Sequence, residues 1–191
     1  MIPNYNGFNA QVNSGARAIL PAGNYIAKIK QAEVAKTRNG GTQLIINFDI
    51  DAGDYAGFFA ADYRAQTDDT KKWRGVYRLF IPTGDGSAKD GYAVRNCNNL
   101  AGCLEDSNPG YHWDWDERKF KGLSIGVMFR EKEWEFNGRT GWTTECGGVA
   151  TVEAVSNGSL KVMKPKALSN TAPAAQNFVQ LPDDEDGDLP F

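Results

Sequence analysis

Apolar and polar residues alternate in two neighbouring segments near the start of the chain. Tyr25, Ala27 and Ile29 fall on one face of the first segment, and the second segment is apolar at positions 44, 46, 48 and 50. Such alternation is typical of half-buried strands. The residues between the segments, Asn39-Gly40-Gly41, favour the positive φ angles of a tight turn. The pattern therefore predicts a long β-hairpin.

The other predicted strands lie at residues 55–64, at residues 73–81 and in a second hairpin. Pro82 and the Gly84-Asp85-Gly86 turn end the strand at 73–81. In the second hairpin, apolar residues alternate from residue 123 to 129 and Asn137-Gly138 favours a turn. Residues 142–155 then form the return strand.

Only one segment has the period of a helix. Ser87, with Asp90 three residues later, fits the start of a capping box. The positions that follow form one apolar stripe: Ala93, Cys97, Leu100, Ala101 and Leu104. Asn108-Pro109-Gly110 ends the helix. The order of elements predicts a β-rich, OB-fold-like five-stranded antiparallel barrel with a single helix between the third and fourth main strands.

Composition adds limits on where the protein works. No segment approaches the roughly 18 to 20 apolar residues that span a bilayer, and the N-terminal residues lack a secretory pattern. Cys97, Cys103 and Cys146 have neither disulfide nor zinc-ligand spacing. We therefore expect a cytoplasmic protein with no membrane partner and no cofactor.

The modest net charge of −3 hides an asymmetry. Residues 183–188 hold five of the 24 acids and no base, which leaves 19 acids against 21 Lys and Arg in residues 1–182, a net charge of +2. A basic body with an acidic end suggests a body that meets a polyanion. We expect an N-terminal arm (1–20), a binding domain (21–163), a flexible linker (164–182) and an acidic, disordered tip (183–191).

The tip is also the strongest candidate for a partner-binding peptide. Its acids run directly into Leu-Pro-Phe and a free carboxylate, which fit a pocket flanked by Lys or Arg on another protein. A merely solubilising tail would not need an exposed aromatic end. The partner-binding candidates are Asp183, Asp184, Asp186, Asp188, Leu189, Pro190 and Phe191.

Basic and aromatic residues interleave most densely between residues 63 and 78. Aromatic faces stack on bases whatever their identity, and neighbouring Lys and Arg neutralise phosphates. The alternative, that single aromatics here belong to the core, stays open. With a basic first strand and the Trp that flanks the second turn, the candidates for nucleic-acid binding are Lys28, Lys30, Lys36, Arg38, Arg64, Lys71, Lys72, Trp73, Arg74, Tyr77, Arg78 and Trp134.

The chain end resembles the C-termini of the single-stranded DNA-binding proteins of bacteria and their phages, which finish in Asp-Ile-Pro-Phe or close variants. Here the end reads Asp186-Gly187-Asp188-Leu189-Pro190-Phe191, with Leu in place of Ile and Gly among the acids. Residues 21–60, and more loosely residues 122–153, resemble small phage replication and recombination proteins of OB-fold type. Between residues 58 and 92 this chain is longer than that family, so binding residues there do not carry over.

The resemblance implies a non-catalytic, phage-encoded protein that coats single-stranded DNA in the host cytoplasm without strong sequence preference, either as a monomer or as a homo-oligomer. The tip would recruit replication, recombination or repair enzymes. As a flexible coil, residues 166–182 would span about 20 to 25 Å, so the acids could also compete with DNA for the binding groove.

Two other functions remain open from the sequence. A β-barrel module could bind a protein or an oligosaccharide through its Trp residues, and such binding would depend little on salt. A Mg²⁺-dependent phage nuclease would need a carboxylate cluster that the body lacks. His112, the only histidine, has no nucleophile in a recognisable motif, and we expect it to be structural.

Overall fold

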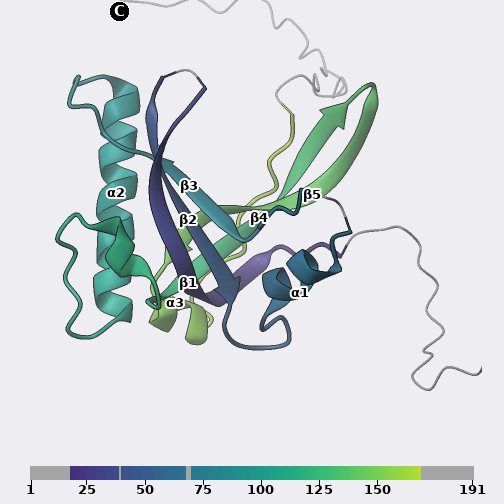
Figure 1. Ribbon diagram of the computed structural model, residues 1–191, viewed down its shortest axis with the longest axis horizontal. Helices are drawn as coiled ribbons and strands as arrows, with labels where there is room; N and C mark the ends of the chain where they lie inside the picture. The colour runs from purple at the N-terminus through teal and green to yellow at the C-terminus, as the bar shows by residue number, and fades with distance from the viewer. Residues whose placement is uncertain (1–17, 39, 68–69, 169–191) are drawn as a thin grey trace, which may run out of the picture.

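The computed structural model describes residues 18–38, 40–67 and 70–168 (Figure 1). Within them, five antiparallel strands form one sheet in the order β3-β2-β1-β4-β5. The strands are β1 (Gly23–Lys36), β2 (Thr42–Ile50), β3 (Val76–Phe80), β4 (Ser124–Phe136) and β5 (Arg139–Ala150). The predicted β-rich fold is confirmed, and both predicted hairpins are present.

Strand β1 joins the two halves of the sheet. Residues 23–28 pair with β4, whereas residues 27–36 pair with β2. A register shift between Ile29 and Gln31 marks a bulge, which increases local twist. The edge strands β3 and β5 come within 8 Å of each other, Cα to Cα, but no described residues of the two strands pair. The sheet is therefore open between them.

The core lies on one face of the sheet, as the alternation predicts. Its buried residues come from all five strands, chiefly β1, β2 and β4, and include Ala27, Ile29, Leu44, Ile46, Phe48, Ile50, Ile125, Val127 and Phe129. Helix α2 (Ala88–Ser107) packs against β3, β4 and β5. It contributes the buried residues Ala93, Cys97, Leu100, Cys103 and Leu104, close to the predicted stripe.

The start of α2 uses half of the predicted capping box. The Ser87 hydroxyl accepts a hydrogen bond from the backbone N–H of Asp90 at 3.1 Å. The Asp90 carboxylate does not reach back to the cap; it accepts from the backbone N–H groups of Thr83 and Gly84. Asp90 therefore fixes the approach of the chain from β3 to the helix.

The prediction of a strand at residues 55–64 is wrong, because helix α1 (Phe58–Ala65) occupies that segment. The cause is a distant cap. Asp49, at the end of β2, is buried and its carboxylate accepts from the backbone N–H groups of Phe59 and Ala60. A carboxylate at these positions satisfies the free donors of a first helical turn.

The prediction of a single helix is also wrong. Besides α1, a 3-10 helix forms at Glu117–Phe120 and helix α3 at Val152–Ser156. The predicted return strand ends at Ala150, because the hydroxyl of Thr151 accepts from the backbone N–H of Ala154 and starts α3.

The described chain ends alongside β4. The backbone of Lys166 exchanges hydrogen bonds with Glu131 and Glu133, and the Leu168 N–H donates to the Glu133 carboxylate at 3.0 Å. The predicted linker thus follows β4 for its first residues; residues 169–182 lie outside the described residues. None of the described helices is long and apolar enough to cross a membrane.

Candidate nucleic-acid interface

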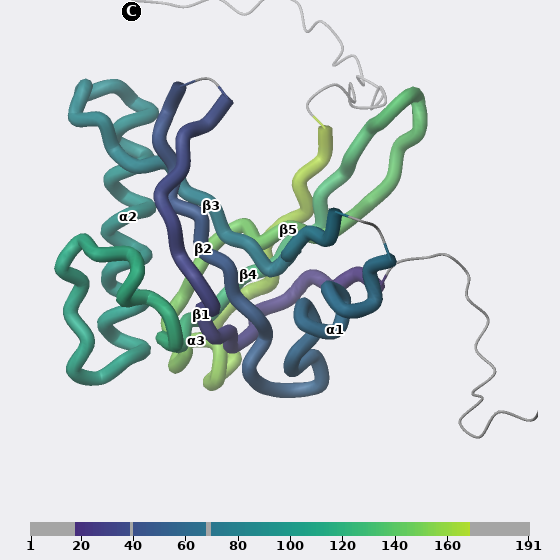
Figure 2. The backbone as a smooth tube through the Cα atoms, viewed as in Figure 1, coloured from purple at the N-terminus to yellow at the C-terminus, as the bar shows by residue number. Residues whose placement is uncertain are grey.

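A groove of about 790 Å³ lies between the unpaired edges of β3 and β5. One wall is β3 and the segment before it, and the other is residues 143–149 of β5. The N-terminal half of α2 and the first residues of α1 also contribute. Figure 2 shows the β1–β2 and β4–β5 hairpins as two separate arms that project to the same side of the molecule.

The groove is strongly basic. Its lining includes five bases and one acid: Lys72, Arg74, Arg78, Arg130 and Lys166, against Glu145. Two of the bases form ion pairs, since Arg74 contacts Asp62 at 3.1 Å and Arg130 contacts Glu145 at 2.8 Å. The surplus of positive charge suits a polyanion.

Arg78 is the best-placed free cation of the groove. It is exposed on β3, and no described acid lies within 4 Å of its guanidinium. Among the described residues that line the groove, the one acid, Glu145, is held by Lys132 and Arg130. Burial opposes ionisation of Glu145, but hydrogen bonds from those two bases outweigh it and lower the pKa of the carboxyl. Glu145 is therefore ionised and paired at neutral pH.

Two exposed aromatic rings lie in the same groove. Phe80, at the end of β3, is 61% exposed, and Tyr92, on the first half of α2, is 60% exposed. The thiol of Cys97 lies 3.9 Å from the Phe80 carbonyl oxygen, so α2 approaches β3 here. The guanidinium of Arg95 lies 5.8 Å from the centre of the Tyr92 ring. Such rings can stack on bases.

Two of the three aromatics that the sequence favoured, Tyr77 and Trp73, lie in the core or against it. Tyr77 is only 8% exposed, and burial raises its pKa to about 12. The indole N–H of Trp73 donates to the carbonyl oxygens of Phe48 and Gly75. Both side chains belong to the core or pack against it. For these two residues, the alternative of a structural role fits the structure better.

The structure brings together five of the twelve predicted binding residues. Lys72, Trp73, Arg74, Tyr77 and Arg78 line the groove. The other seven do not: Lys28, Lys30, Lys36, Arg38, Arg64, Lys71 and Trp134.

These seven residues have other surroundings. Lys28 lies 4.0 Å from Asp51, and Lys36 donates to the Thr42 hydroxyl. Lys71 sits 5.8 Å from the centre of the Tyr63 ring. Trp134 covers Gly141 on the β4–β5 hairpin, where an added Cβ would meet its ring at 2.7 Å. The remaining three are exposed: Lys30, Arg38 and Arg64.

Sequence reasoning missed Phe80, Tyr92, Arg130 and Lys166 as groove residues. The pattern of β3 carries a signal for Phe80, since Tyr77 and Leu79 are buried and Arg78 and Phe80 alternate with them. Tyr92 falls outside the apolar stripe of α2, which also indicates exposure. Arg130 and Lys166 carry no such signal, because only tertiary structure brings them to the groove.

Other predicted features bear less on this groove. His112 contacts Glu105 at 2.9 Å, on the loop after α2. Within residues 18–38, 40–67 and 70–168, no group of three or more His, Cys, Asp or Glu side chains is placed to hold a metal ion. The predicted partner-binding residues 183–191 lie outside the described residues.

Comparison with known protein families found no model that matches this chain, and comparison with curated proteins found no match either. The assignment of function therefore rests on the chain's own residues and their geometry.

Proposed function

We propose that this protein binds single-stranded DNA in the groove between β3 and β5, without strong sequence preference and without catalysis. The observation that carries the proposal is the lining of the groove, which contains five bases, one acid and two exposed aromatic rings. Phosphates would pair with the bases, of which Lys72, Arg78 and Lys166 are exposed. Bases would stack on Phe80 and Tyr92.

The strand order supports an OB-fold barrel as the scaffold. β1 pairs with both β2 and β4, β5 follows β4 in a hairpin, and a helix lies between β3 and β4. An OB-fold has this order, is partly open, and binds oligonucleotides near its second and third strands. In this protein the barrel would be open between the edges of β3 and β5, where the groove lies.

Single-stranded rather than duplex DNA fits the position of the rings. A base can reach Phe80 or Tyr92 only if it is unstacked from its neighbours, as in a single strand. Both rings lie in a groove and not on a protruding element that could enter the groove of a duplex. The acidic tip would then act outside the groove and recruit enzymes of replication, recombination or repair.

Binding of a fluorescein-labelled oligo-dT, followed by anisotropy across a salt series, tests the proposal. If three or four of the groove bases contact phosphates, the slope of log K against log salt should be about −2 to −3. A labelled duplex of the same length should bind more weakly. Absence of binding at 50 mM salt would refute the proposal, and tight binding that does not change with salt would favour a sugar or protein ligand instead.

A further inference from the structure

One aromatic side chain is exposed far from the groove. Trp115 lies in the segment that joins α2 to β4, residues 109–121, which we call the Trp115 loop. Its side chain is 77% exposed, and its backbone has a φ of 69°, in the left-handed region that residues other than Gly rarely adopt. The fold therefore holds a large apolar ring in water by means of an unfavourable backbone conformation.

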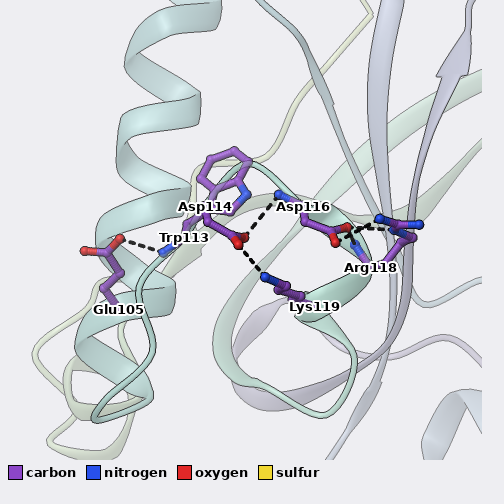
Figure 3. Close-up of polar contacts among 6 residues, drawn as sticks. All are labelled: Glu105, Trp113, Asp114, Asp116, Arg118 and Lys119. Atoms are coloured by element: carbon purple, nitrogen blue, oxygen red, sulfur yellow. Dashed lines mark hydrogen bonds and ion pairs between the residues drawn. The ribbon is translucent and has the colours of Figure 1, made fainter.

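Hydrogen bonds of the residues before and after Trp115 in the sequence fix the Trp115 loop (Figure 3). The Glu105 carboxylate accepts from the backbone N–H of Trp113 at 3.1 Å. Asp114 accepts from Lys119, and Asp116 accepts from the backbone N–H and the guanidinium of Arg118. A surface held in one conformation loses little entropy when a partner binds.

The Trp115 ring packs against Trp113, which connects it to the core. Its centre lies 4.8 Å from that of Trp113, whose ring contacts the buried Phe120 at 5.3 Å. One side of Trp115 is thus supported, and its other side is open to solvent. This placement resembles that of the Trp anchors that dominate protein–protein interfaces.

The charges around Trp115 differ from those of a nucleic-acid site. Residues 114–121 contain three acids and three bases: Asp114, Asp116 and Glu117, with Arg118, Lys119 and Lys121. The net charge is therefore zero, and two of the bases are already paired within the loop. Figure 1 shows this segment beside the lower half of α2 at the left of the view, whereas β5 lies at the right. A polyanion in the groove would leave the loop accessible.

We propose that the Trp115 loop is the contact between two copies of this chain. A surface that meets its own copy about a twofold axis must be complementary to itself. Glu117 and Lys121 form no ion pair among the described residues, whereas the other four charges are paired within the loop. The surface therefore meets that condition: ring faces ring, and Glu117 of each copy faces Lys121 of the other. The dimer would leave both grooves open to DNA.

Sedimentation of the full-length protein over a range of concentrations tests this contact. Trp115→Gly removes the ring and also fits the positive φ, so the variant should fold. We expect the wild type to form a dimer and Trp115→Gly to raise its dissociation constant at least about tenfold. Phe136→Ala removes a similarly exposed aromatic, 70% exposed on the β4–β5 hairpin, and should change the constant less than about twofold.

A second variant tests the charge balance. Glu117→Lys leaves two acids and four bases in the patch, so the two copies would repel each other, and the dimer should weaken most at low salt. The proposal is overturned if the wild type stays a monomer up to about 1 mM, if Trp115→Gly dimerises like the wild type, or if Phe136→Ala weakens the dimer equally. The affinity for oligo-dT per chain should be the same in Trp115→Gly as in the wild type, however much the dissociation constant of the dimer changes.

Discussion

The groove and the Trp115 loop share one sequence theme and differ in their electrostatics. In both, aromatic residues are followed by bases: Trp73-Arg74 and Tyr77-Arg78 at the groove, and Trp115 before Arg118 and Lys119 in the loop. The groove has five bases for one acid in its lining, whereas residues 114–121 have three of each. Interleaved aromatic and basic residues therefore do not identify a nucleic-acid site without the position of the acids.

The acids also reach their partners in different ways. In the loop, Asp116 and Asp114 pair with bases two and five residues away. At the groove, Asp62 and Glu145 pair with Arg74 and Arg130 across 12 and 15 residues. Neutralisation in the loop can be anticipated from local sequence, but the free charge of the groove depends on the tertiary fold.

Reversal of charge should separate the two regions most clearly. Lys72→Glu combined with Arg78→Glu removes two of the proposed phosphate contacts and places two acids in the groove. We expect the affinity for oligo-dT at 100 mM salt to fall at least about 100-fold, since hydrogen bonds to charged groups contribute about 1.5 to 3 kcal/mol each. Fluorescence anisotropy measures the loss.

The matched control makes the same change of charge in the loop. Arg118→Glu combined with Lys119→Glu should lower the affinity less than about threefold, because charges beyond about 10 Å are screened at this salt. Equal losses in the two variants would mean that overall charge, and not the groove, determines binding.

Removal of an aromatic ring should give the next largest difference. Phe80→Ala removes an exposed ring from the groove and should weaken oligo-dT binding by about 1 to 3 kcal/mol, the range for one stacked base. Trp115→Gly removes a more exposed ring from the loop and should leave DNA binding unchanged. If Phe80→Ala binds DNA as tightly as the wild type does, stacking on Phe80 is refuted, even if the charge-reversal variants of the groove bind DNA more weakly.

Within β3, Tyr77 and Phe80 should differ as core and surface residues. Because burial raises the pKa of Tyr77 to about 12, the folded state favours the neutral phenol. The contribution of this group to the free energy of unfolding is complete below pH 10, the ordinary pKa, and is lost as the pH rises toward 12. At pH 11 the loss is about 1 kcal/mol.

Tyr77→Phe has no phenol to ionise and tests this expectation. No hydrogen bond of the Tyr77 hydroxyl is present among the described residues, so the variant should be about as stable as the wild type at pH 8. Urea unfolding at pH 8 and pH 11 should show a smaller decrease for Tyr77→Phe than for the wild type. Parallel decreases would place the phenol in contact with solvent, where it could stack on DNA.

The sequence predicts those parts of the fold that depend on local periodicity. Both hairpins and α2 follow from apolar spacing and from turn residues close in sequence. Helix α1 does not, because the carboxylate that caps it, Asp49, comes from the end of another strand. The groove was predicted in part: Arg78 and Lys72 lie in one basic segment, but Arg130 and Lys166 join them only when the edges of the sheet approach each other.

The smallest expected effect concerns the acidic end of the chain. The described residues end at Leu168, two positions after Lys166, which lines the groove. If residues 169–182 act as the linker that the sequence predicts, they span about 20 Å, so the acids of residues 183–188 can reach the groove but have no net positive charge to meet at the Trp115 loop. Deletion of residues 183–191 should therefore raise the affinity for oligo-dT about three- to tenfold at 50 mM salt and have little effect at 300 mM.

Replacing the five acids by Asn and Gln, with Leu189-Pro190-Phe191 kept, should give the same increase, because charge and not the apolar end causes the competition. In the Lys72→Glu, Arg78→Glu background the deletion should lose its effect. An unchanged affinity at low salt would refute competition for the groove and would leave recruitment of other proteins as the tip's role.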